Sequence, residues 1–176
     1  MILLDACVLI NLCATDRLEE ISRCVPGGFS VAAAAREEAL FLRDPGDIVH
    51  PLKPLVLDPF FDQGVLHLLP MEADEETLFV NIAAELDEGE AMSMAIAIER
   101  NLDLAADDRK AIRLFTKFGG DPNRLWTTLS VVRMWADAAA LSVEELGRAA
   151  RAIRDRARYL PAPNHPLYSW WSPLLA

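Results

Sequence analysis

The chain has 176 residues, of which 52% are hydrophobic, so it is long enough for one well-packed domain and too short for two. A formal net charge of -10 argues against strong nonspecific binding of polyanions by the whole surface, although it leaves room for a local basic region. No apolar run approaches the ~20 residues needed to cross a bilayer, which predicts a soluble protein with no membrane partner.

The chain contains three cysteines, Cys7, Cys13 and Cys24. They form no C-x-x-C pair and lie in apolar stretches, which is typical of buried free thiols. Free thiols indicate a reducing compartment, so we expect the protein to be cytoplasmic.

Short apolar runs alternate with helical patterns at the start of the chain. Residues 2–4 suit a buried strand, and the apolar residues from position 8 to position 21 follow helical spacing until a Pro-Gly-Gly sequence stops the pattern. Residues 29–31 are a second strand candidate. Strong helix formers then predict a helix over residues 32–43.

A Pro-rich insertion is predicted over residues 45–74, where five of the eleven prolines fall. Two apolar runs, at residues 55–57 and 65–69, predict strands joined by a connection over residues 58–64.

Two consecutive helices follow within residues 74–100. They are separated near Asp87, which fits an N-cap, with Glu90 three residues later as in a capping box. The remaining predicted elements are a buried strand at residues 102–106, a helix at 108–118, a short strand at 125–127, and helices at 129–139 and 142–159.

The element order predicts one domain over residues 1–159, which includes the insertion. Residues 160–176 form a tail rich in proline and aromatic residues, expected to pack on the body of the protein or on a partner. Strands separated by helices predict a parallel sheet covered by helices on both faces.

Five carboxylates occupy positions where a strand turns into a helix, or lie along a helix that follows such a turn: Asp5, Glu38, Glu90, Asp107 and Asp108. In parallel α/β folds, ligands collect beyond the carboxyl ends of the strands, so these acids can meet there. Two carboxylates ~4 Å apart repel by about 4 kcal/mol at an effective dielectric near 20. Such a cluster needs bound cations or protons, and oxygen ligands without clustered Cys or His favour Mg²⁺ or Mn²⁺ over zinc.

Each carboxylate also has a purely structural interpretation. Asp5 fits an N-cap, and Glu90 could only complete a capping box. One of Asp107 and Asp108 is expected to cap the next helix, which leaves the other for a metal. Glu38 could be an ordinary surface residue of its helix.

Four segments in the same order resemble the PIN-domain nucleases, the family that includes VapC-type toxins of toxin-antitoxin pairs. The segments are residues 4–12, 37–40, 86–97 and 106–113. The most specific of them contains the pattern G-E-A-x-x-x-A-I-A, which begins at Gly89. The chain departs from the family at Ala32–Ala35 and Ala106, so the choices between Glu37 and Glu38 and between Asp107 and Asp108 stay open.

The resemblance implies a three-layer α/β/α sandwich with a central, mostly parallel, twisted sheet, Mg²⁺ or Mn²⁺ in an acidic pocket, and single-stranded RNA as substrate. It implies a toxin whose partner is a small antitoxin protein, and we expect a homodimer. The predicted catalytic residues are Asp5, Glu38, Glu90 and Asp108. The predicted metal ligands are Asp5, Glu90, Asp107 and Asp108.

Basic residues near the predicted site could hold RNA. Arg109 and Arg113 lie on one helical face with Lys117, directly after Asp108, and are the predicted substrate-binding residues. A second stripe contains Arg148, Arg151, Arg154 and Arg158, and it too could hold RNA. Because Glu144 can pair with Arg148, and Arg151 with Asp155, we favour its interpretation as a solvated face.

Two functions are compatible with this sequence. The first is a metal-dependent endoribonuclease. The alternative is a non-catalytic PIN-like module that binds proteins. Retention of all the acidic positions favours the nuclease.

Overall fold

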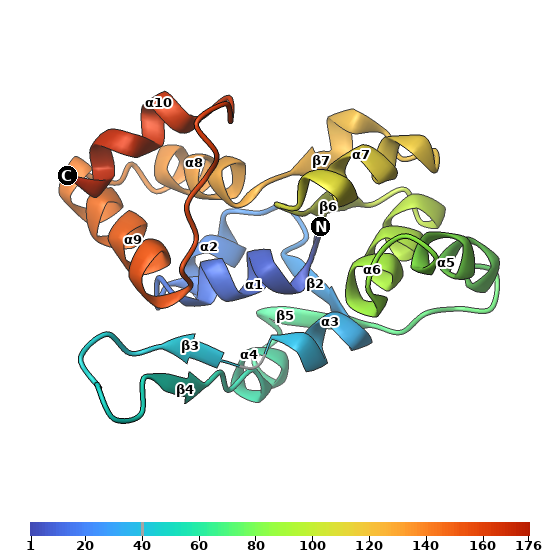
Figure 1. Cartoon of the computed structure of the whole chain (residues 1–176), viewed down its shortest axis with the longest axis horizontal. Helices are drawn as coiled ribbons and strands as arrows, with labels where there is room; N and C mark the ends of the chain where they lie inside the picture. Colours follow the sequence, from blue (N-terminus) through green and yellow to red (C-terminus); the bar gives the residue numbers. More distant parts are fainter. Residues whose placement is uncertain (40) are drawn as a thin grey trace.

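A five-stranded parallel sheet forms the centre of the protein, as shown by a computed structural model in which residues 1–39 and 41–176 are described. The strand order is β5-β2-β1-β6-β7. The strands are β1 (Ile2–Leu4), β2 (Phe29–Ala32), β5 (Leu66–Leu69), β6 (Asp103–Ala105) and β7 (Leu125–Trp126). Helices flank this sheet, which confirms the predicted three-layer α/β/α sandwich (Figure 1).

The chain leaves the central strand β1 in two directions. It runs through β2 to β5 on one side, then returns to β6 and β7 on the other. Right-handed crossovers therefore place the helices before and after this reversal on opposite faces. In Figure 1, α1, α2, α8 and α9 lie to the left of the sheet and α5, α6 and α7 to its right. The bounds are α1 (Ala6–Cys13), α2 (Leu18–Arg23), α5 (Glu76–Ala83), α6 (Glu88–Glu99), α7 (Arg109–Lys117), α8 (Thr128–Ala138) and α9 (Val143–Arg156).

The central strands are short and buried. All three residues of β1 and all four of β2 are buried. A parallel strand covered on both faces has no solvent side, which explains why these segments are apolar except for the buried Ser30. The position between β1 and β6 is the switch point of the sheet, where this class of fold places its ligands.

The predicted helix over residues 32–43 is wrong in its second half. Helix α3 (Ala33–Glu38) ends early, and β3 (Phe41–Arg43) pairs antiparallel with β4 (Leu52–Pro54) in a separate hairpin. Leu42 is buried between two exposed neighbours, which is the period of a strand. Leu40, the last residue of the segment that resembles the PIN family here, lies outside the described residues.

The insertion also differs from its prediction. Residues 55–57 form no strand, and the predicted connection contains a short helix, α4 (Asp58–Asp62), with Pro59 near its start. Proline suits this position because the first turn of a helix needs no amide donor there. The first predicted helix is two helices, separated near Asp16, which has a positive φ of 57°.

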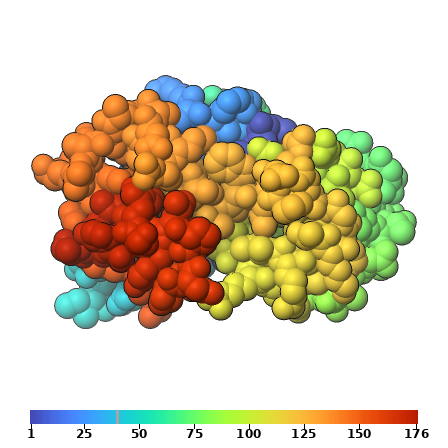
Figure 2. All heavy atoms as spheres, turned by 90° about the horizontal axis from the view of Figure 1, so that it is seen from above, coloured from blue at the N-terminus to red at the C-terminus, as the bar shows by residue number. Residues whose placement is uncertain are grey.

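The tail packs on its own chain. It contains α10 (Tyr168–Trp171) and a 3-10 helix at Ser172–Leu175, and it contacts α9. Figure 2 shows these C-terminal residues beside α8 and α9 on one face of the molecule. Arg151 of the second arginine stripe donates to the carbonyl oxygen of Leu174 at 3.1 Å. No helix in the described part of the chain is long and apolar enough to span a membrane.

Candidate functional site

Asp5 lies at the carboxyl end of the central strand and is only 3% exposed. It occupies the N-cap position of α1, yet its side chain makes no capping hydrogen bond. Capping therefore does not explain this carboxylate. Burial and, next, the negative charge of Glu90 together raise the pKa of Asp5 to about 7, and the neighbouring amide of Ala6 opposes them only in part.

Glu90 lies in the first turn of α6. Its backbone amide donates to Asp87 Oδ1 at 2.9 Å, so Asp87 is the N-cap, as predicted. The reciprocal half of the capping box is absent among the described residues, because the Glu90 carboxylate does not bond back to the Asp87 amide. Burial and the charges of Asp87, Asp108 and Glu38 raise the pKa of Glu90 to about 7.

Glu38 reaches the same region from the end of α3. It accepts a hydrogen bond from the Gly89 amide at 3.0 Å, and burial and the charge of Asp87 raise its pKa. Both glutamates are exposed, but Glu37 lines a different surface with Ala33, Arg36 and Leu68. Of the two glutamates, Glu38 is thus the one that joins the other acids.

The Glu38 carboxylate lies against Gly89. A Cβ built on Gly89 would overlap the Glu38 carboxylate. Glycine therefore allows α3 and α6, which pack against each other, to approach with a carboxylate between them. This contact gives a physical reason for the glycine of the G-E-A pattern.

Gly89→Ala should destabilise the protein by roughly 1–2 kcal/mol, because the added methyl group displaces Glu38 from the Gly89 amide. In a Glu38→Ala background the same change should instead stabilise the protein, since alanine is the better helix former by up to about 1 kcal/mol. Urea unfolding of the four proteins in this cycle measures both effects. Equal effects of Gly89→Ala in the two backgrounds would show that Glu38 does not fix this glycine.

Asp107 is held by four hydrogen bonds. Its Oδ1 accepts from the Thr128 amide at 3.0 Å and from the Tyr159 hydroxyl at 3.1 Å. Its Oδ2 accepts from Asn11 Nδ2 at 3.0 Å and from Thr128 Oγ1 at 2.6 Å. These bonds use the acceptor capacity of the carboxylate, so Asp107 is not the free aspartate that the sequence predicted.

Asp108 is the N-cap of α7. Its Oδ1 accepts from the amides of Lys110 and Ala111 at 2.7 and 3.0 Å, which confirms that one of the two aspartates caps this helix. The charge of Asp108 also raises the pKa of Glu90, so Asp108 faces the other acids. It keeps Oδ2 outside these capping bonds.

We define the acidic group as Asp5, Glu38, Asp87, Glu90 and Asp108, the residues whose charges act on Asp5 or Glu90. Sequence reasoning assigned Asp87 only to capping. Across residues 1–39 and 41–176, no three Asp, Glu, His or Cys side chains converge closely enough to hold a metal ion. A cation would therefore have to draw the side chains of this group together.

The predicted substrate-binding arginines lie on the exposed side of α7. Arg109 donates to Asn164 Oδ1 of the tail at 2.8 Å, and Arg113 is exposed. Lys117 forms an ion pair with Glu85 at 2.6 Å. The structure thus leaves Arg113 more accessible to a ligand than its two neighbours on this face.

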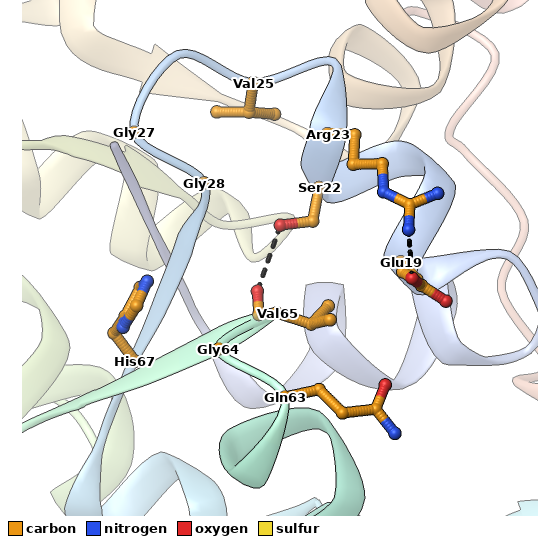
Figure 3. A pocket seen from close by; sticks show the side chains of 10 residues that line it. All are labelled: Glu19, Ser22, Arg23, Val25, Gly27, Gly28, Gln63, Gly64, Val65 and His67. Carbon is orange, nitrogen blue, oxygen red and sulfur yellow. Dashed lines mark hydrogen bonds and ion pairs between the residues drawn. The ribbon is translucent and has the colours of Figure 1, made fainter.

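A separate pocket lies at the opposite edge of the sheet, where β2 and β5 begin. Figure 3 shows Ser22 donating to the Val65 carbonyl oxygen, and Arg23 paired with Glu19. Gly28 and His67 also line it, and no member of the acidic group does. Its charged groups neutralise each other, so we assign it no chemistry.

The cysteines follow their prediction only in part. All three are free; Cys13 is buried and Cys24 is half-buried. Cys7 is exposed, which contradicts the prediction of a buried thiol. It lies in the first turn of α1, where the charges of Asp5, Asp107 and Glu90 act on its thiol.

Comparisons with protein-family models, with curated proteins and with solved structures give no match for this chain. The functional interpretation therefore depends on the geometry and chemistry of the acidic group.

Proposed function

We propose that this protein is an endoribonuclease that uses Mg²⁺ or Mn²⁺ to hydrolyse single-stranded RNA, and that it is the toxin of a toxin-antitoxin pair. The observation that carries the proposal is Asp5, a buried carboxylate at the switch point of the sheet whose pKa is raised to about 7. An acid in this state is unfavourable for folding unless a cation offsets its charge. The proposal includes a homodimer, an antitoxin partner and a cytoplasmic location.

The acidic group fits a hard divalent cation by its chemistry. Its members are all carboxylates, and the pKa values of Asp5, Glu38 and Glu90 are raised in the absence of a cation. Asp5, Glu90 and Asp108 would hold the metal, with Glu38 beside them. The metal would supply a more acidic water and neutralise charge on the departing oxygen.

Other residues of the chain prepare this site. The bonds from Asn11, Thr128 and Tyr159 fix Asp107 and hold the ends of β6, α1 and α8 together around the acids. Arg113 offers an exposed guanidinium for phosphate oxygens on α7, the helix that Asp108 caps.

Divalent-dependent cleavage of single-stranded RNA is the direct test. Glu38→Gln should reduce the rate by about 10²-fold or more, because the carboxylate that faces the acidic group is lost. Glu37→Gln is the matched control, since it makes the same change one residue away on a side chain that lines a different surface. RNA that stays intact with Mg²⁺ and with Mn²⁺ would refute the nuclease, and equal rates for the two variants would remove Glu38 from the site.

The second candidate is a non-catalytic PIN-like module that binds proteins. The observation in its favour is that the described side chains include no ready-made metal group, and that Asp107 is fully engaged in hydrogen bonds. Thermal unfolding separates the two functions. Millimolar Mg²⁺ or Mn²⁺ should raise the melting temperature of a metalloenzyme, and should leave that of a non-catalytic module unchanged.

A further inference from the structure

A pocket lined by three arginines lies away from the acidic group, where the hairpin meets the end of α9. Arg43 comes from β3, Arg154 from α9, and Arg158 from the residues just after α9. Pro45, Asp155 and Leu160 complete the lining. In Figure 1 the β3–β4 hairpin lies below the end of α9, where the chain turns upward into the tail, and β3 contacts α9. We call this the arginine pocket.

The arginine pocket carries a net positive charge on an acidic protein. Arg154 forms an ion pair with Asp155 at 2.7 Å and donates to the Leu175 carbonyl oxygen at 3.3 Å. Among the described residues, the side chains of Arg43 and Arg158 form no ion pair and no hydrogen bond with protein. Three guanidinium groups thus face a single carboxylate, in a chain whose net charge is -10.

The backbone of Arg158 has an unfavourable conformation. Its φ is 61°, in the left-handed region. It is the first residue after the C-cap of α9, where glycine or asparagine is usual because an L side chain is disfavoured there. A strained arginine that projects into a pocket of like charge is not explained by stability, and such outliers concentrate at functional sites.

A short segment of chain, Arg158 to Leu160, connects the arginine pocket with the surroundings of Asp107. Tyr159, the next residue, donates its hydroxyl to Asp107. Leu160 follows, and it lines both the arginine pocket and a second pocket that contains Asp107, Arg109 and His165. One short segment of chain therefore separates the free arginines from the switch point.

We propose that the arginine pocket binds a phosphate group of single-stranded RNA, and that the strand runs from there past Leu160 to the acidic group. This proposal rests on the proposed function, which supplies RNA as the polyanion. Guanidinium groups bind phosphate oxygens in pairs and are less strongly hydrated than ammonium groups. A local positive pocket also explains how a chain with a strongly negative net charge can hold a polyanion.

Binding without hydrolysis tests the arginine pocket. An Asp5→Asn protein in EDTA is mixed with fluorescently labelled single-stranded RNA, and anisotropy gives the dissociation constant over a range of salt concentrations. Adding Arg158→Asn should weaken binding and reduce the slope of log K against log salt by about 0.7, the value expected for one lost phosphate contact on a single strand. Its melting temperature should be unchanged or higher, because asparagine tolerates a positive φ.

Arg148→Asn is the matched control. It also removes one positive charge, in this case from α9. Arg148 pairs with Glu144 and lies outside the arginine pocket. Its affinity and salt slope should equal those of the parent. Arg43→Gln should act like Arg158→Asn, because both side chains face the pocket without a partner among the described residues.

The outcomes separate this inference from the proposed nuclease. Equal binding by the Arg158 and Arg148 variants would overturn the arginine pocket as an RNA site, whether or not the wild-type protein cleaves RNA. Tighter binding of an acidic peptide than of RNA would assign the pocket to a protein partner and overturn it too. Arg158-dependent binding by a protein that never cleaves RNA would support the strand path and refute only the nuclease.

Discussion

Asp5→Asn should stabilise the metal-free protein at about pH 8 and abolish RNA cleavage. The wild-type carboxylate is buried near Glu90, and its ionisation in the folded state is opposed by burial and by that neighbouring charge. Asparagine has nearly the same shape without the charge. The gain is up to about 4 kcal/mol, which is the free-energy equivalent of a pKa shift from 3.8 to about 7.

The pH dependence of this gain has a definite sign. The pKa of Asp5 is higher in the folded protein than its ordinary value of 3.8, so the folded state binds more protons between the two values. The contribution of Asp5 to stability is therefore fully present below about pH 4 and is lost as the pH rises through about 7. Wild type and Asp5→Asn should be equally stable near pH 4 and differ most above pH 7.

Urea unfolding over this pH range measures the difference. Asp62→Asn is the matched control, because Asp62 is exposed at the end of α4, and its loss should change stability by less than about 0.5 kcal/mol at every pH. Mg²⁺ should raise the melting temperature of wild type and leave Asp5→Asn unaffected. An Asp5→Asn protein that is no more stable than wild type at pH 8 would show that ionisation of Asp5 does not destabilise the folded protein.

The centre of the sheet could be predicted from sequence because β1 and β2 are buried on both faces. Residues 2–4 and 102–106 were predicted as buried strands from their mostly apolar sequence, and the structure finds β1 and β6 within them as strands of the parallel sheet. The β3–β4 hairpin could not be predicted in the same way. Its first strand follows a run of strong helix formers. The alternation of exposed and buried residues in this strand is visible only in the structure, where Leu42 is buried by tertiary contacts.

The acids at the strand ends could be predicted because each of them follows its strand closely in the sequence. Asp5 and Asp108 follow β1 and β6 closely, and parallel strands bring such positions to one edge. The partners of Asp107 were not predicted. Thr128 and Tyr159 lie 21 and 52 residues away along the chain, so no spacing rule connects them.

Asn11 is the one partner of Asp107 that stands out from its sequence context. It is a polar residue among the apolar residues of α1, and it is buried, 3% exposed. A buried amide must find hydrogen bonds, and Asn11 donates to Asp107 and to Thr128. Asn11 is polar and lies in the apolar helix that begins directly after Asp5. It could therefore have been interpreted as part of the site.

Trp171→Ala should destabilise the protein by roughly 3–5 kcal/mol, the largest effect expected from a substitution in the tail. Trp171 is fully buried, and the tail around it is fixed to α9 by hydrogen bonds from Arg151 and Arg154 to its backbone carbonyl oxygens. Removing the indole leaves a cavity that the surrounding helices cannot close. Denaturant unfolding of the full chain measures the loss.

Trp171→Phe should cost much less than Trp171→Ala. The indole Nε1 of Trp171 is buried without a hydrogen-bond partner among the described residues, so phenylalanine keeps most of the apolar contact and removes an unsatisfied donor. Trp170→Ala is the control within the same helix: Trp170 is only half-buried, with Arg133 over its ring at 5.1 Å, and its loss should cost about 1 kcal/mol. If Trp171→Ala unfolded at the same urea concentration as wild type, the tail would not be part of the hydrophobic core. The tail would then not fix the position of the segment between the arginine pocket and Asp107.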